Sequence, residues 1–201
     1  DLSYLFFGLN DTYVAQAVDG LKYILRIYRA NWRSRSEICY ELDALNHLSD
    51  RGVRVAHPIR RLDGEYLQAL SAIEGERYAV LFVYAPGKQI SYEDDSTNQL
   101  LEYGRTVAKI HEATKDFTSR HDRFSLDLNH LLEEPLTTIA LRLSHRADDW
   151  HYLQRLADRI RDRFAAIPSS NLETGFCHGD FHGGNVHVTE DNAVMVFDFD
   201  G

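Results

Sequence analysis

The most informative stretch of the sequence reads FCHGDFHGGN over residues 176–185 and VHVTEDNAVMVFDFDG over residues 186–201. Two short apolar runs, 186–189 and 193–197, flank the polar residues Glu190-Asp191-Asn192, and this pattern predicts a β-hairpin. Asn185 precedes the first run and Asp198 follows the second. The hairpin therefore places these two side chains next to each other at its open end.

Residues around this open end have the chemistry of a phosphate-transfer site. The amide oxygen of Asn185 and the carboxylate of Asp198 are hard oxygen ligands, suited to Mg²⁺ shared with substrate phosphates. Asp180 lies five residues before Asn185, where it can take a proton from an attacking hydroxyl. A base, metal ligands and basic groups on the phosphates are the parts that phosphoryl transfer requires.

The spacing of these residues resembles a known family. His178-Gly-Asp180, Asn185 and Asp198 are similar to the catalytic loop and metal-binding segment of the aminoglycoside phosphotransferase and choline kinase family, relatives of protein kinases. The resemblance implies ATP and Mg²⁺ as cofactors, Asp180 as the catalytic base, and His178 as a structural member of the catalytic loop. Asn185 and Asp198 would be the metal ligands.

The resemblance also implies a fold and a nucleotide site. We expect an α+β, protein-kinase-like fold in which residues 1–84 form a small antiparallel lobe with one helix. Residues 85–201 would be a mainly helical catalytic lobe, incomplete at its C-terminal end. The residues expected to contact the nucleotide are Arg26, Glu41, the connector Val83, Tyr84 and Ala85, and Gly8 and Asn10 in the turn 8–11 that would cover the phosphates.

Two positions depart from the family pattern. The family usually has Lys on the third strand, whereas Arg26 stands there, and a planar guanidinium replaces a point charge. The phosphate-covering turn contains only Gly8, so it has no glycine-rich signature.

The first third of the chain has the pattern of strands around one helix. Apolar runs at 13–18 and 23–28 flank the turn Asp19-Gly20, which predicts an antiparallel hairpin. Ser34 and Glu37 have the spacing of a capping box and predict a helix of about 14 residues that ends near Gly52. A second turn at 63–64 and a buried strand at 78–84 follow, and Pro86-Gly87 ends that strand.

Glu41 lies on the apolar stripe of the predicted helix, together with Ile38, Leu45 and Leu48. A buried carboxylate is costly unless it is paired. Either Glu41 sits at the edge of the stripe with its head in water, or it pairs with a basic residue of the preceding strand. Arg26 is the leading candidate for that partner.

The remainder begins with helices. Residues 86–97 form the natural connector. Two apolar stripes with helical spacing follow it, and they consist of Leu100, Tyr103, Val107 and Ile110, and of Leu153, Leu156, Ile160, Phe164 and Ile167.

Composition excludes several classes of protein. With 44% hydrophobic and 26% charged residues in 201, the chain is typical of a soluble globular protein, and the longest apolar stretch, 78–85, is too short to span a membrane. A net charge of −9 argues against nucleic-acid binding, although residues 20–36 hold five basic residues and no acidic ones. That run is either a solvated face or a source of phosphate contacts. The two cysteines give no disulfide framework, and we expect a cytoplasmic protein.

The ends of the sequence suggest that it belongs to a longer protein. It starts at Asp1 and stops at Gly201 directly after an apolar strand. In the family, helices beyond the metal-binding Asp build much of the acceptor pocket, so we expect that pocket to be incomplete here. The acidic run Glu93-Asp94-Asp95 would suit a cationic acceptor, and a solvated surface explains it equally well.

Other interpretations of the same residues remain open. Residues 179–183 also fit the G-D-x-H-G signature of metallophosphoesterases, but no further ligand set follows. Cys177, His178, His182 and His187 match no familiar zinc spacing. A catalytically silent kinase-like module would be expected to have lost one of Asp180, Asn185 and Asp198. Among enzymes, the acceptor could be a small hydroxyl compound resembling an aminoglycoside, choline or homoserine, or a protein Ser/Thr residue, as in bacterial stress-response kinases.

Overall fold

The computed structural model describes residues 1–90, 97–168, 170 and 172–201. It forms two compact units, one of residues Asp1–Arg123 with Gly175–Gly201 and the other of Phe124–Thr174. The domain boundary predicted at 84–85 lies inside the first unit and stays a prediction. The acidic run at 93–95 lies outside the described residues.

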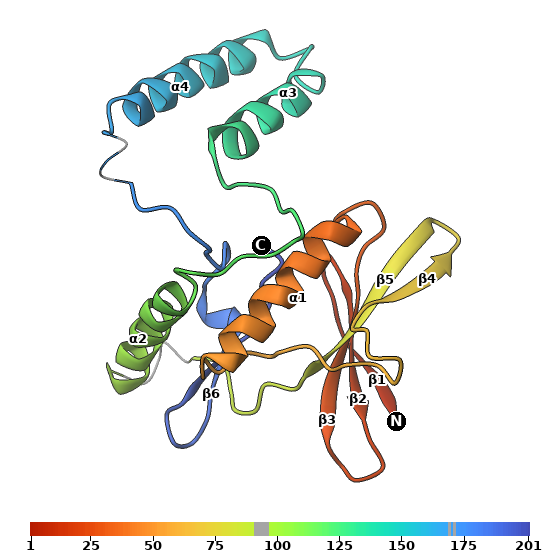
Figure 1. Cartoon of the computed structure of the whole chain (residues 1–201). Coiled ribbons are helices and arrows are strands. Elements are labelled where there is room, and N and C mark those ends of the chain that lie inside the picture. Colours follow the sequence, from red (N-terminus) through yellow and green to blue (C-terminus); the bar gives the residue numbers. More distant parts are fainter. Residues whose placement is uncertain (91–96, 169, 171) are drawn as a thin grey trace. The chain divides into compact units, whose positions relative to one another are not determined.

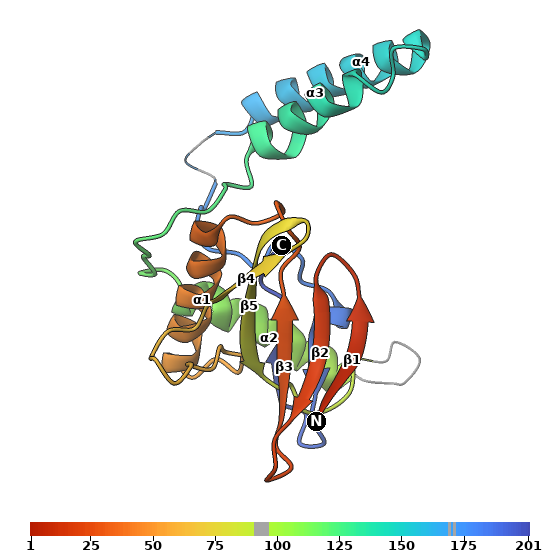
Figure 2. The ribbon, with the colours of Figure 1, turned by 90° about the vertical axis from the view of Figure 1, so that its right-hand side faces the viewer.

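A five-stranded antiparallel sheet forms the first part of the larger unit (Figures 1 and 2). Its strands are β1 (Leu2–Phe7), β2 (Asp11–Gln16), β3 (Lys22–Ile27), β4 (Gln68–Ala72) and β5 (Gly75–Val83), in the order β1-β2-β3-β5-β4. The predicted hairpin is β2–β3, and its turn contains Gly20 with a φ of 87°, a conformation that glycine adopts without strain. The sequence pattern did not predict β1 and β4.

The helix α1 (Arg35–Asp50) begins at the predicted capping box. The Ser34 hydroxyl accepts from the Glu37 N–H at 3.2 Å, and the Glu37 carboxylate accepts from the Ser34 N–H at 2.7 Å. The inward face of α1 includes Ile38, Leu42 and Leu45, which belong to the same core cluster as residues of β5. Glu41 is on this face and only 2% exposed, so it does not lie in water at the edge of the stripe.

The larger unit is completed by the connector, by α2 (Thr97–Ala113) and by the predicted hairpin, β6 (Val186–Val188) with β7 (Val194–Val196). Val186 and Val196 are fully buried, and Val196 also pairs with Val55. A short 3₁₀ turn, η3 (Gly183–Asn185), leads into β6. Because both strands of the hairpin have buried valines, the loops at its open end are anchored to the core.

The smaller unit is helical. It contains a short π-helical turn, η1 (Asn129–Glu133), followed by α3 (Glu134–Ala140) and α4 (Ala147–Ala165). The Arg161 guanidinium makes two hydrogen bonds to the Glu133 carboxylate, at 2.8 and 2.7 Å. The predicted stripe at 153–167 falls mostly on α4, but its Ile160 and Phe164 are exposed, as is Ile167 beyond the end of the helix.

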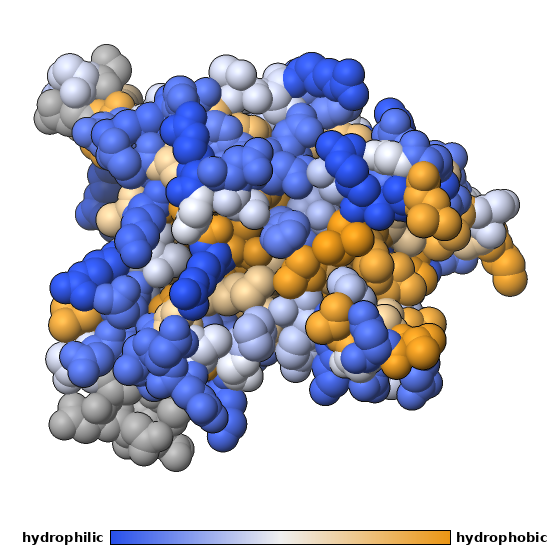
Figure 3. All heavy atoms as spheres, turned by 60° about the horizontal axis from the view of Figure 1, so that its bottom comes forward, coloured by the Kyte–Doolittle hydropathy of each residue, from blue (hydrophilic) through white to orange (hydrophobic). Residues whose placement is uncertain are grey.

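Apolar side chains are also found on the surface. Leu2, Tyr4 and Leu5 of β1 are each about half exposed, at 54–55%. Figure 3 shows one face of the molecule, on which apolar residues gather toward the middle and one side and hydrophilic residues surround them. Among the helices of the described residues, none is both long and apolar enough to span a membrane.

Candidate active site

A cavity of about 970 Å³ lies within the larger unit. Its walls come from the β1–β2 turn, β3, α1, the connector and the segments before and after the β6–β7 hairpin. Ten predicted site residues line it: Gly8, Asn10, Arg26, Glu41, Val83, Tyr84, Ala85, Asp180, Asn185 and Asp198. The eleventh, His178, does not line the cavity and is buried beside it.

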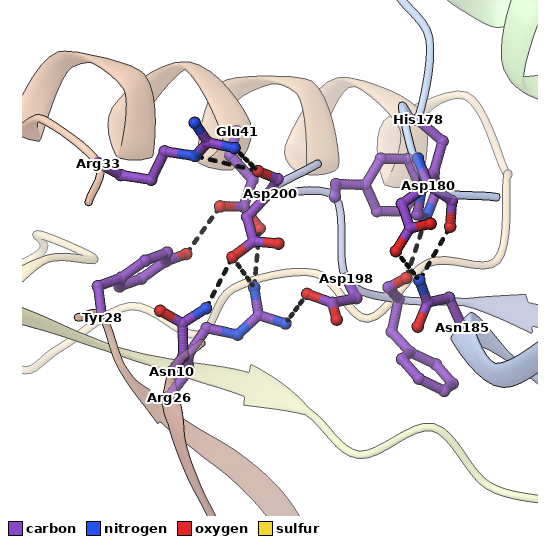
Figure 4. A network of polar contacts seen from close by, with 12 residues as sticks. Asn10, Arg26, Tyr28, Arg33, Glu41, His178, Asp180, Asn185, Asp198 and Asp200 are labelled. Carbon is purple, nitrogen blue, oxygen red and sulfur yellow. Dashed lines mark hydrogen bonds and ion pairs between the residues drawn. The ribbon is translucent and has the colours of Figure 1, made fainter. Parts of the chain in front are cut away.

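The loop before β6 brings Asp180 and Asn185 together (Figure 4). The Asn185 amide donates to the Asp180 backbone carbonyl at 2.9 Å and to its carboxylate at 3.2 Å. The Asp180 side chain is 62% exposed, so this carboxylate is open to a substrate. A base held by a hydrogen bond on one oxygen and open on its other side can accept a proton from a bound hydroxyl.

His178 holds this loop from below. Its Nε2 lies 3.0 Å from the Phe197 carbonyl oxygen, and its Nδ1 accepts from the Asp180 N–H at 3.3 Å. Because the carbonyl can only accept, the hydrogen must be on Nε2, and the ring is neutral. Burial lowers the pKa of His178 below its ordinary value, which favours this neutral form.

The open end of the hairpin has the donor atoms that a magnesium ion requires. The Phe197 N–H donates to the Asn185 carbonyl at 3.0 Å, so Asn185 and Asp198 flank the end of the ladder as predicted. Since the Asn185 amide nitrogen is directed at Asp180, its oxygen is left as an acceptor. Amide and carboxylate oxygens, completed by phosphate oxygens and water, fit Mg²⁺. Among the described residues, no three or more His, Cys, Asp or Glu side chains are grouped to hold a metal without a substrate.

Asp198 has an unusual backbone and an ion pair. Its φ is 69°, a left-handed conformation that is rare for residues other than glycine and that is often found at functional sites. Its carboxylate accepts from Arg26 at 2.7 Å. Burial raises the pKa of Asp198, and Arg26 opposes this shift.

Arg26 joins two acidic residues of the site. Its Nη1 lies 3.2 Å from Glu41 Oε1, which is the predicted ion pair, while its Nη2 contacts Asp198. The second Glu41 oxygen accepts from the Tyr28 hydroxyl at 2.8 Å. Burial raises the pKa of Glu41 to about 7, although Arg26 lowers it. The planar guanidinium, unlike the expected lysine, can hold both carboxylates at once.

The segment after β7 is held by residues that the sequence pattern did not single out. The Asn10 amide donates to the Asp200 carboxylate at 2.7 Å, and Arg33 donates to the Asp200 backbone carbonyl at 2.5 Å. Arg123 donates to the Phe199 carbonyl at 2.8 Å. Asp200 was visible in the sequence as the second carboxylate of Asp198-Phe199-Asp200, but no spacing rule assigned it a partner. Tyr28 follows Arg26 by two residues, a spacing that can place side chains on one side of the chain.

The site and the fold together define a protein-kinase-like phosphotransferase. The chain belongs to the phosphotransferase enzyme family, whose model matches residues 8–201. It is 41% identical over 193 residues to an uncharacterized protein of Synechocystis sp., covering 96% of this chain and 53% of the relative. It is 28% identical over 193 residues to the amicoumacin kinase of Bacillus subtilis, covering 94% of this chain and 55% of that enzyme.

A solved structure supports the fold. The amicoumacin kinase hAmiN, in complex with AMP-PNP, Ca²⁺ and Ami, superimposes with a TM-score of 0.77 over 99% of this chain and 58% of that one, at 22% identity. The chain spans about half the length of the curated relatives that it matches. The predicted α+β, protein-kinase-like fold and the predicted family are therefore confirmed.

Proposed function

We propose that this chain contains the ATP-binding and catalytic machinery of a phosphotransferase that moves the γ-phosphate of ATP to a hydroxyl group of a small molecule. The observation that carries the proposal is the grouping of Asp180, Asn185 and Asp198 in one cavity, with Arg26 on Asp198. These are the base, metal-ligand and cationic groups of phosphoryl transfer.

The residues have separate tasks in this reaction. Asp180 accepts the proton of the acceptor hydroxyl as its oxygen forms a bond to the γ-phosphorus, and the bond between that phosphorus and the β–γ bridging oxygen breaks to release ADP. Asn185 keeps the Asp180 carboxylate in place through its amide. A bound Mg²⁺ would neutralise the phosphate charge, and Asn185 and Asp198 are the residues that would hold it.

The basic residues act on charge and on geometry. Arg26 lines the cavity between Glu41 and Asp198, a position from which it can contact phosphate oxygens. Glu41, held by Tyr28, fixes the direction of the guanidinium. Val83, Tyr84 and Ala85 would contact the adenine, and Gly8 and Asn10 would cover the phosphates.

The relatives favour a small-molecule acceptor. The curated relative in Bacillus subtilis is an amicoumacin kinase, and several others are homoserine kinases. We therefore expect a small compound with a hydroxyl group, rather than a protein side chain, to accept the phosphate.

The test is a screen of hydroxyl compounds with MgATP, in which ADP release and the phosphorylated product are measured together. Aminoglycosides, amino alcohols such as choline, and hydroxyl amino acids such as homoserine form the panel. We expect at least one compound to be phosphorylated, and the variant Asp198→Ala to lose both MgATP affinity and rate. ATP binding without transfer to any compound would instead identify a silent nucleotide-binding module.

A further inference from the structure

The connector end of the cavity contains a histidine that the proposed reaction does not use. His187 is the central residue of β6, and its neighbours Val186 and Val188 are buried in the core. Because successive side chains of a strand alternate, His187 faces the other way and lines the cavity. Its ring packs edge-on against Phe197, with centroids 4.9 Å apart, and Phe197 also lines the cavity.

His187 makes a short hydrogen bond to the connector. Its Nδ1 lies 2.6 Å from the carbonyl oxygen of Ala85. A carbonyl oxygen has no hydrogen to donate, so Nδ1 carries the hydrogen and His187 is the donor. The bond joins the middle of β6 to one of the three connector residues that line the cavity.

The backbone around this bond is fixed closely. Lys88 and Val188 exchange two backbone hydrogen bonds, at 3.0 and 2.7 Å. Gly87 allows this approach, because a Cβ at that position would lie 2.3 Å from the Val188 carbonyl oxygen. The connector is therefore held along β6 by the Lys88–Val188 pair and, three residues earlier, by the His187 side chain.

The N–H of Ala85 is left for a ligand. The Val83 N–H donates to the His57 carbonyl at 3.0 Å, whereas no residue in the described part of the chain accepts from the Ala85 N–H. Ala85 is only 6% exposed, and buried backbone N–H groups almost always have a partner. Since Ala85 lines the cavity, an acceptor atom of a bound molecule would satisfy this group.

We propose that His187 is a positioning residue for the nucleotide base. By holding the Ala85 carbonyl, His187 restricts the backbone dihedrals of Ala85 and directs its N–H to an acceptor nitrogen of the purine ring. The His187 and Phe197 rings, together with Ile24 and Phe82, supply apolar surface for the base. The inference rests on the proposed function, because it assumes that a nucleotide occupies this cavity.

The test compares three substitutions of one residue by their affinity for adenosine, measured by calorimetry without metal. The side-chain amide of Asn can place a donor near the position of Nδ1, so His187→Asn keeps the bond to Ala85. His187→Leu removes the donor, and His187→Gln places its amide too far along the side chain. We expect Leu and Gln to weaken adenosine binding by about 3- to 10-fold, the effect of one hydrogen bond, and Asn to stay within about twofold of the wild type.

Two further measurements separate positioning from general damage. The KM for ATP should rise with the adenosine Kd in the Leu and Gln variants, while kcat at saturating ATP changes less. Binding of inorganic triphosphate with Mg²⁺ should not change, because it uses the opposite end of the cavity. If the Leu variant does not fold, the comparison of Asn with Gln decides the question.

The outcomes that overturn the inference are distinct from those that overturn the proposed function. Adenosine binding that is unchanged in the Leu and Gln variants, that is equally weak in the Asn variant, or that is lost together with triphosphate binding would refute the role of His187. A wild-type protein that binds adenosine through His187 but transfers no phosphate would refute the proposed function alone. A wild-type protein that does not bind adenosine would refute both.

Discussion

At the scale of single residues, the site depends on Arg26, which contacts Glu41 and Asp198 at once. A carboxylate on an apolar helix stripe was enough to predict that Glu41 needs a partner. The sequence could not predict the contact between Arg26 and Asp198, because 172 residues separate the two and no local pattern links them. The same holds for Asn10 and Asp200, which are 190 residues apart.

The ion pair between Arg26 and Glu41 can be tested by a double-mutant cycle. Glu41→Ala leaves a buried guanidinium with one partner fewer, and we expect it to lower the free energy of unfolding and to raise the KM for ATP. Because the two residues interact directly, the effects of Glu41→Ala and Arg26→Ala should not add. A coupling of less than about 0.5 kcal/mol would mean that the pair contributes nothing.

His178 predicts a specific dependence of stability on pH. Burial lowers its pKa in the folded protein from 6.5, so the folded state binds fewer protons than the unfolded state just below that pH. The stability that neutral His178 contributes is therefore present above pH 6.5 and is lost as the pH falls below it. The measurement is urea unfolding of the wild type and of His178→Gln across this range. The difference between the two should shrink with acidification, and a constant difference would contradict the assignment.

At the scale of elements, local signals predicted most of what the structure contains. The Asp-Gly turn, the capping box of α1 and the β6–β7 hairpin each depend on residues close together in sequence. The strands β1 and β4 were not predicted. Their side chains are mostly exposed in the described residues, so they carry little of the alternation that identifies a strand.

The capping box gives a prediction about α1, the helix that carries Glu41. Ser34→Ala removes the acceptor for the Glu37 N–H, and we expect it to lower the free energy of unfolding by about 1 kcal/mol. Ser71→Ala, on the exposed side of β4, is the matched control and should change stability by less than about 0.5 kcal/mol. Equal effects of the two substitutions in thermal or urea unfolding would show that the cap does not stabilise the helix.

At the scale of the whole molecule, the sequence predicted the residues of the site better than their connections. Ten of the eleven predicted residues line one cavity, although they come from both ends of the chain. The family resemblance supplied that grouping, since it rests on the spacing of Asp180, Asn185 and Asp198. The role of His187 at the other end of the cavity was not predicted, because a histidine inside a short strand has no distinguishing pattern.

The most direct measurement is the phosphate-transfer rate of Asp180→Asn at saturating ATP and acceptor, compared with its affinity for MgATP. Asn is nearly isosteric with Asp but cannot accept the proton of the acceptor hydroxyl. We predict that the rate falls by roughly 10² or more, while the MgATP affinity stays within a few-fold of the wild type. A rate equal to that of the wild type would contradict the assignment of Asp180 as the base, and with it the phosphotransfer mechanism proposed for this site.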